Sequence, residues 1–125
     1  MTYRHERHFT IAEAIQSLYD HHSMIEKMQS LSGQLLAGGY DIHQTRPVSV
    51  QQDLPKEFSQ LLDVIWNLES AGILVKDIEQ GIVDFPHLRE SGEEVYLCFK
   101  LGEEIIQYWH SLDSGFSSRQ LLDQI

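Results

Sequence analysis

Side chains that can exchange protons or bind a metal ion gather in the C-terminal half of the sequence, around predicted turns and strand ends, where functional groups are usually displayed. The candidates are Lys76, Asp84, Glu103, His110, Asp113 and Arg119. Oxygen and imidazole ligands of this kind suit zinc or a related divalent ion. Arginine can hold a carboxylate or phosphate with two parallel hydrogen bonds, and histidine exchanges protons near neutral pH.

We expect any functional site to lie where the fourth predicted strand ends, centred on His110 with Asp113 and Arg119. Asp84 or Glu103 joins this site if the sheet brings them close. The histidine and these three carboxylates are also the candidate metal ligands. A plainer interpretation stays open, in which Arg119 pairs with Asp113 or Asp84 and pins the tail against the sheet.

The remaining chemistry-bearing residues have plainer explanations. His5 and His8, two of seven histidines, precede the first helix in a segment expected to be mobile and solvated. Cys98 is the only cysteine, which excludes an internal disulfide and a cysteine-rich zinc site. It lies in mid-strand, away from any activating base in the sequence, and is expected to be structural. No HExxH motif, phosphate-binding glycine loop or nucleophile elbow identifies an enzyme.

The elements that must position these side chains begin with two helices. A capping box and apolar residues at three- and four-residue spacing predict a long helix over Thr10–Ala37. After a polar connection over residues 38–52, a second helix is predicted over Asp53–Ala71, with its first residue as cap and Pro55 in its first turn. Two helices joined in this way most simply form an antiparallel hairpin that needs another layer on one side.

Over Ile73–His110 the apolar period changes from 3.6 towards 2, which predicts a four-stranded antiparallel β-meander. A three-residue hairpin loop, Glu79–Gly81, places Lys76 opposite Asp84. A cross-strand ion pair of this kind is worth at most about 1 kcal/mol and is the plain explanation of these charges. The sequence therefore predicts an α+β fold with the helical hairpin packed on the meander.

Turn residues bound the later strands. Pro86 ends the second strand because it cannot donate to a ladder. The third strand, Glu94–Lys100, alternates an aliphatic face, which should meet the helices, with a face of tyrosine and cysteine. A tight turn at Leu101–Gly102 then sets Lys100 opposite Glu103 in a second ion pair.

The fourth strand is predicted over Glu104–His110. In this register Ile106 and Tyr108 join the aliphatic face of the third strand, with His110 at its far end, and Trp109 lies on the other face. Residues 111–125 are predicted to form a loop and tail, with a short terminal helix as one outcome.

Several runs of residues follow a recognisable family pattern. They are Phe9-Thr10, Glu13-Ala14, Val75–Ile78, Gly81–Pro86, Val95–Glu103, Tyr108–His110 and Gly115–Arg119. Through them the chain resembles the bacterial family catalogued as domain of unknown function 2203. Phe99 stands where that family usually has tryptophan, which keeps an aromatic ring but removes an indole donor. The resemblance implies a small stand-alone bacterial protein and supplies no reaction.

Composition sets further limits. With 125 residues, of which 42% are hydrophobic, the chain makes one domain. Its parts are an N-terminus (1–9), the helical hairpin (10–72), the meander (73–110) and a C-terminal loop and tail (111–125). A formal net charge of -10 disfavours a nucleic-acid partner. No apolar run approaches the roughly 18 residues that span a bilayer, and no secretory signal begins the chain, so we expect a cytoplasmic protein without a membrane partner.

Two functions from different classes fit these features. The first, favoured by the missing catalytic motifs, is a non-enzymatic interaction module that forms a homodimer or binds another protein. The first helix is the longer one, and its Ile25, Met28 and Leu31 extend beyond the expected reach of the second, where a two-fold partner would cover them. The second is a metal or small-anion binding protein, with a hydrolase-like enzyme as one form of it. Its cofactor is a divalent metal ion, and the sequence leaves open whether the protein is an enzyme.

Overall fold

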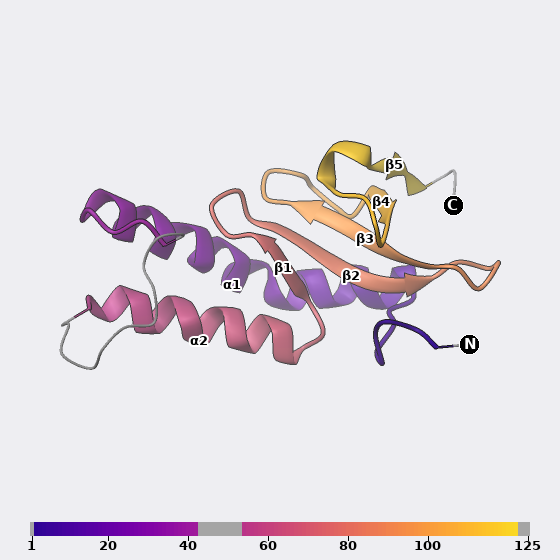
Figure 1. Ribbon diagram of the computed structural model, residues 1–125, viewed down its shortest axis with the longest axis horizontal. Coiled ribbons are helices and arrows are strands. Elements are labelled where there is room, and N and C mark those ends of the chain that lie inside the picture. Colours follow the sequence, from indigo (N-terminus) through magenta and orange to yellow (C-terminus); the bar gives the residue numbers. More distant parts are fainter. Residues whose placement is uncertain (1, 43–53, 123–125) are drawn as a thin grey trace.

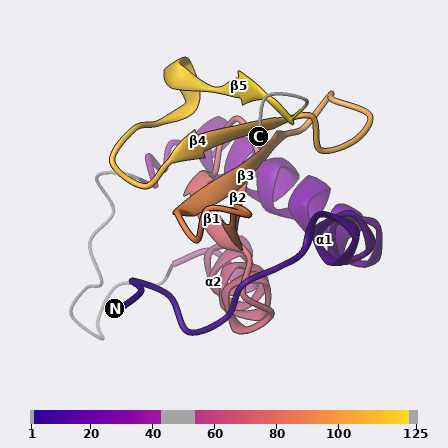
Figure 2. The same ribbon diagram turned by 90° about the vertical axis from the view of Figure 1, so that its right-hand side faces the viewer.

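The computed structural model describes residues 2–42 and 54–122. The chain has an α+β fold of two helices and an antiparallel sheet (Figure 1). The elements are α1 (Ile11–Ala37), α2 (Lys56–Ser70), β1 (Leu74–Asp77), β2 (Ile82–Leu88), β3 (Glu94–Lys100), β4 (Tyr108–Ser111) and β5 (Gln120–Leu121). The strand order follows the chain, with β1 next to α2 and β5 farthest from it (Figure 2). Neither helix is long and apolar enough, in the ranges described, to cross a membrane.

Local signals place the helix ends close to their predicted positions. At the start of α1, the Glu13 N–H donates to Thr10 Oγ1 at 3.0 Å and the Thr10 N–H donates to Glu13 Oε1 at 2.8 Å. After α1 the chain turns at Gly39, whose φ of 92° is a left-handed conformation that favours glycine. Pro55 precedes α2, while the predicted cap at Asp53 and most of the predicted connection lie outside the described residues.

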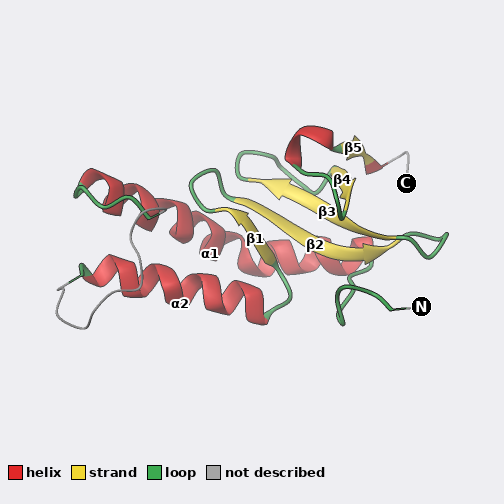
Figure 3. Ribbon diagram, in the orientation of Figure 1, coloured by secondary structure: helices red, strands yellow, loops and turns green. Residues whose placement is uncertain are grey.

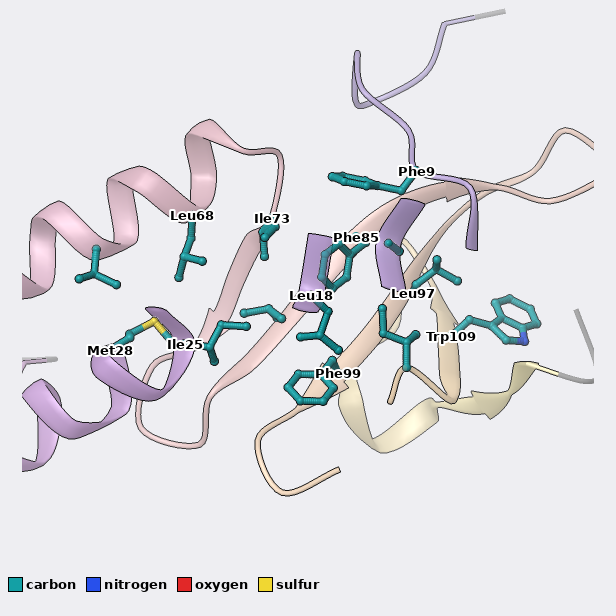
Figure 4. Packing of buried hydrophobic residues seen from close by; sticks show 14 of the residues in the cluster. Phe9, Leu18, Ile25, Met28, Leu68, Ile73, Phe85, Leu97, Phe99 and Trp109 are labelled. Atoms are coloured by element: carbon teal, nitrogen blue, oxygen red, sulfur yellow. The ribbon is translucent and has the colours of Figure 1, made fainter. Parts of the chain in front are cut away.

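The core lies between the helices and one face of the sheet (Figure 4). Buried side chains of α1, α2 and β2–β4 form one apolar cluster there. Ile25 and Met28 are 0% exposed and Leu31 is 4% exposed, so the prediction that these three side chains need a partner to cover them is wrong. The physical reason is that α2 packs against α1, and side chains of the sheet cover the part of α1 that the shorter α2 does not reach.

The first two strands pair through a β-bulge at Lys76. Leu74 rather than Lys76 lies opposite Asp84, and the ladder then skips one residue between Val75 and Asp77. The predicted pairing of Lys76 with Asp84 is therefore wrong, because the hairpin loop is longer than three residues and β1 carries an extra residue. This bulge frees Lys76 from the ladder and lets it share a face with Asp77.

Strand β2 continues through Pro86, where the sequence predicted its end. Pro86 lies opposite Tyr96 of β3, while its carbonyl oxygen accepts a hydrogen bond from the Phe9 N–H at 2.7 Å. The N and C=O groups of one strand residue point to the same side, so the N–H that proline lacks would face the N-terminal segment and not the β3 ladder. Proline is tolerated because β1 pairs with β2 only as far as Asp84.

The N-terminal segment is held against β3, so the expectation that its histidines are solvated is wrong. The Glu94 carboxylate accepts hydrogen bonds from the N–H groups of Arg4 at 2.8 Å and His5 at 3.0 Å, and lies 2.7 Å from His8 Nε2. His5 Nε2 also lies 2.6 Å from the Tyr96 hydroxyl. Burial raises the pKa of Glu94, but the hydrogen bonds lower it by more, and the net shift is downward.

The register of β3 with β4 differs from the prediction and decides which side chains face the core. The predicted turn forms, since the Glu103 N–H donates to the Lys100 carbonyl at 3.1 Å, but β4 begins only at Tyr108. Leu97 consequently lies opposite Trp109, three positions from the Ile106 that a continuous strand would place there. An odd shift moves every side chain of the strand to the other face.

Trp109 therefore packs in the core, and His110 lies on the opposite face of the sheet. The tryptophan is buried in the apolar cluster with Leu97, and His110 lies opposite Tyr96. The predicted placement of Tyr108 on the core face and Trp109 on the outer face is thus wrong. Val95, Leu97 and Phe99 face the helices as expected.

The C-terminal segment adds a fifth strand, where a loop and tail with a short terminal helix had been predicted. After a 3-10 turn at Phe116–Ser118, β5 pairs with β4, with Leu121 opposite Tyr108 and Gln120 opposite Trp109 (Figure 3). Residues 123–125 lie outside the described part of the chain. The outer edge of β4 gains a partner in this way, which is a common means of covering an exposed strand edge.

Candidate functional site

The face of the sheet away from the helices carries a cluster of polar side chains. Asp84 of β2 lies opposite Cys98 of β3, which in turn lies opposite Tyr108 of β4. Two positions along the strand, Tyr96 lies opposite His110. Residues that are directly opposite in an antiparallel pair share a face. The ladder therefore brings Asp84 and His110, which are 26 residues apart in sequence, to the same side.

Asp84 and His110 form a buried pair. His110 Nε2 lies 2.9 Å from Asp84 Oδ2, with 4% of the histidine side chain and 1% of the aspartate side chain exposed. His110 Nδ1 lies 2.8 Å from the Ser111 carbonyl oxygen, which can only accept, so Nδ1 carries a proton. Burial lowers the pKa of His110, but the hydrogen bond and the negative charge of Asp84 outweigh it and raise that pKa. Nε2 is thus the nitrogen that shares a proton with the carboxylate.

The third member of the cluster is Cys98. Its sulfur, an oxygen of Asp84 and a ring nitrogen of His110 all lie within 4.8 Å of one another. Burial raises the pKa of the Cys98 thiol far above its usual range, and the negative charge of Asp84 raises it further. The thiol is therefore protonated in the protein as described, and it is not a ready nucleophile.

The Oδ1 atom of Asp84 stands out in this cluster. It is buried and accepts no hydrogen bond from any residue in the described ranges. A buried carboxylate oxygen without a hydrogen-bond donor destabilises the folded protein, because the oxygen has lost its hydrogen bonds to water and has no replacement for them. Such an atom indicates a position where a cation or a hydrogen-bond donor belongs.

A pocket of about 320 Å³ opens above the buried pair. Its lining residues are Lys76, Asp77, Gln80, Ile82, Asp84, His110, Ser114, Gly115 and Phe116. The Lys76 ammonium lies 4.4 Å from the centroid of the Tyr96 ring, which positions its charge by a cation–π contact. Among the described residues no carboxylate lies within ion-pair distance of this ammonium.

Arg119 and Glu103 form an ion pair beside the cluster, and the Arg119 guanidinium also lies next to the Cys98 side chain. The two guanidinium nitrogens of Arg119 donate to the two carboxylate oxygens of Glu103 at 3.0 and 2.8 Å. The guanidinium carbon also lies 4.1 Å from the ring centroid of Tyr108 and 3.9 Å from that of Phe116. This bidentate ion pair, together with the contacts of the guanidinium with both rings, holds the C-terminal segment against the sheet. The predicted ion pair between Arg119 and a carboxylate is present, but the carboxylate belongs to Glu103 and not to Asp113 or Asp84.

Asp113 lies away from the pocket, paired with Arg4 at 3.3 Å and with 91% of its side chain exposed. The predicted grouping of Asp113 with His110 is wrong, because the loop after β4 points this carboxylate towards the N-terminal segment. The predicted ion pairs of Lys76 with Asp84 and of Lys100 with Glu103 are likewise missing from the described residues. Of the six predicted site residues, the pocket unites three: Lys76, Asp84 and His110.

Two members of the site, Cys98 and Tyr96, were not predicted from the sequence. Strand alternation did place both on one face of β3, which was the available signal. The missing step was the register of β4, because a continuous fourth strand would have set an isoleucine beside Cys98 in place of a tyrosine. Only the observed register places His110 opposite Tyr96.

Comparison with known proteins gives one match. The model of a family described as "Uncharacterized conserved protein (DUF2203)" matches residues 7–122. No curated protein and no solved structure matches the chain. The matched range contains every residue of the buried cluster and its pocket.

Proposed function

The chain belongs to the DUF2203 family of uncharacterized conserved proteins, and from its buried donor cluster we propose that it binds a divalent transition-metal ion of the zinc type through Asp84, Cys98 and His110. The observation that carries this proposal is the convergence of three different donor atoms within 4.8 Å, next to a buried carboxylate oxygen that has no hydrogen-bond partner in the described residues. Carboxylate, thiolate and imidazole are the usual protein ligands of zinc.

The distances suit a metal after small movements. Zinc–ligand bonds of about 2.0–2.3 Å give a tetrahedron with ligand–ligand edges of about 3.3–3.6 Å. The 2.9 Å separation of His110 Nε2 from Asp84 Oδ2 would open by a few tenths of an ångström, and the sulfur already lies within 4.8 Å of the other two donor atoms. The ion would take the place of the proton now shared by Nε2 and Oδ2. Its positive charge also offsets the effect of Asp84 on the thiol, which must bind as thiolate.

The surroundings of His110 support this assignment. A metal-binding histidine usually donates its other ring N–H to a carbonyl or carboxylate, which fixes the ring and its tautomer. The contact of Nδ1 with the Ser111 carbonyl at 2.8 Å has this form and leaves Nε2 for the ion. Three protein ligands leave a fourth position open, and the pocket above Asp84 and His110 would supply it with water or a ligand.

The experiment is a titration of the purified, metal-free protein with Co²⁺, which absorbs visibly in tetrahedral sites and gives a charge-transfer band when a thiolate binds. We expect one equivalent to bind with that band. Cys98→Ser should remove the band, and Asp84→Asn should weaken binding by more than the roughly 10–100-fold that loss of an outer partner costs.

Asp113→Asn is the matched control, because it neutralises a carboxylate that lies outside the pocket. It should bind Co²⁺ as the unaltered protein does, and circular dichroism should confirm that all variants are folded. The proposal fails if the folded protein binds no Co²⁺, or if Asp84→Asn and Asp113→Asn bind it equally well.

Self-association is a second proposal, supported by a different surface. Ile15, Tyr19 and Ile105 are 41%, 82% and 53% exposed and line one shallow groove together with His22 and Glu104. A two-fold contact pairs such residues reciprocally, so an imidazole of one copy can meet a carboxylate of the other. Light scattering at high micromolar concentration should report twice 14.5 kDa, and Tyr19→Glu should abolish the dimer. A 14.5 kDa particle at that concentration would reject this proposal.

A further inference from the structure

We infer that the pocket above the metal site binds a small carboxylate, one oxygen of which takes the open position on the ion while the other meets the Lys76 ammonium. This inference rests on the proposed metal site and names the class of ligand that completes it. It starts from two observations: Lys76, Asp84 and His110 line one pocket, and no carboxylate among the described residues pairs with this lysine.

The position of Lys76 is fixed by the fold. The β-bulge removes it from the β1–β2 ladder, and the ring of Tyr96 holds its ammonium at 4.4 Å from the centroid. Tyr96 in turn packs edge-on against the His110 ring, with centroids 5.5 Å apart. One aromatic ring therefore sets the distance between the lysine charge and the proposed metal ligand. A cation held by an aromatic contact keeps its hydrogen-bond donors free for a ligand.

The size of the pocket favours a small ligand. Its volume of about 320 Å³ is at the lower end of the roughly 300–1,000 Å³ that ligand pockets occupy. Part of the pocket wall is formed by Ser114, Gly115 and Phe116. A Cβ atom added at Gly115 would meet nothing within 4 Å, so this part of the wall leaves room for a ligand beside the Phe116 ring.

The charges of the pocket favour a monoanion over a phosphate dianion. Lys76 is the only lysine or arginine among its lining residues, whereas Asp77 and Asp84 contribute two carboxylates. The Asp77 carboxylate is used within the chain, since it accepts hydrogen bonds from the N–H and side-chain amide of Gln80 at 2.9 and 3.0 Å. Once the divalent ion is held by the Asp84 carboxylate and the Cys98 thiolate, its two positive charges are neutralised, so the Lys76 ammonium is left to balance one negative charge of a ligand and not two. A carboxylate matches the single positive charge at the rim.

The test uses the full chain loaded with one equivalent of Co²⁺ and acetate as the probe. Acetate should change the visible cobalt spectrum in a saturable way, because it replaces water at the open position. Lys76→Met removes the charge and keeps a long side chain, so acetate should bind at least about tenfold more weakly, the loss typical of a hydrogen bond to a charged group.

Lys100→Met is the matched control. Lys100 also stacks on an aromatic ring, with its ammonium 5.5 Å from the centroid of Phe116, but it does not line the pocket. Its substitution should leave acetate binding unchanged.

The outcomes separate the two proposals. If Co²⁺ binds but acetate leaves its spectrum unchanged, or if both lysine variants bind acetate equally, the carboxylate site is refuted and the metal site stands. If inorganic phosphate binds more tightly than acetate, the ligand class is wrong. If the folded protein binds no Co²⁺, both proposals fall.

Discussion

Removing both members of the buried Asp84–His110 pair should cost less stability than the two single removals added together. In metal-free protein, His110→Leu leaves a carboxylate that is 1% exposed without a partner, and a broken buried pair costs about 3–5 kcal/mol. Asp84→Leu should cost about 1–3 kcal/mol. The smaller loss follows because the imidazole can give up one proton and still donate from Nδ1 to the Ser111 carbonyl.

The double variant, with leucine at both positions, buries no charge. Replacing a buried ion pair with apolar residues of similar volume is often neutral or stabilising, so the double variant should lie within about 2 kcal/mol of the unaltered protein. The two single losses together exceed this value, and their non-additivity measures the coupling of the pair.

The assay is urea unfolding at pH 7 with a chelator present, followed by circular dichroism and tryptophan fluorescence. The midpoint gives the stability if the slope is unchanged, and all variants are compared at one protein concentration. Asp113→Leu is the control, since this side chain is 91% exposed and its loss should stay within about 0.5 kcal/mol. Single losses below about 1 kcal/mol, or a double loss equal to their sum, would refute the reasoning, because a buried and coupled pair cannot behave in that way.

Three further predictions concern the core, a turn and the N-terminal segment. Leu97→Ala should cost about 2–5 kcal/mol, because Leu97 is fully buried between the sheet and the helices; a urea-unfolding loss below about 1 kcal/mol would place it outside the core. Gly81→Ala should cost about 1–2 kcal/mol through its φ of 66° alone, and more because the added Cβ would overlap the side chain of Leu101. An unfolding midpoint equal to that of the unaltered protein would contradict that conformation. Glu94, whose pKa is lowered in the folded protein, stabilises it above the usual glutamate pKa of about 4.3 and loses that contribution as pH falls through the folded pKa. Thermal unfolding between pH 3 and 7 should therefore show a smaller acid loss in Glu94→Gln, and equal pH profiles would reject the assignment.

The sequence by itself determined the features whose signals are local. The capping box joins Thr10 to Glu13, three residues away, and the apolar spacing of α1 is repeated at every turn of the helix. The same is true of β3, where alternation correctly assigned Leu97 to the core and Cys98 to the other face. Both helices, the antiparallel sheet and the candidate residues His110 and Asp84 could therefore be read from short stretches of the chain.

Only the tertiary structure decided which candidate residues meet. The chain leaves the ladder before Tyr108, so the predicted register of β4 is off by three positions, and an odd shift reverses both faces of a strand. The residues beside His110 do not specify that shift by themselves, because it depends on how Ile106 and Trp109 pack against core residues that are distant in the sequence. The same long-range packing joins Arg119 to Glu103 and sends Asp113 to the N-terminal segment. A contact between residues 26 positions apart forms only when the sheet assembles. Local patterns therefore identified Lys76, Asp84 and His110 as candidates, but not the geometry that joins Asp84 and His110 to Cys98.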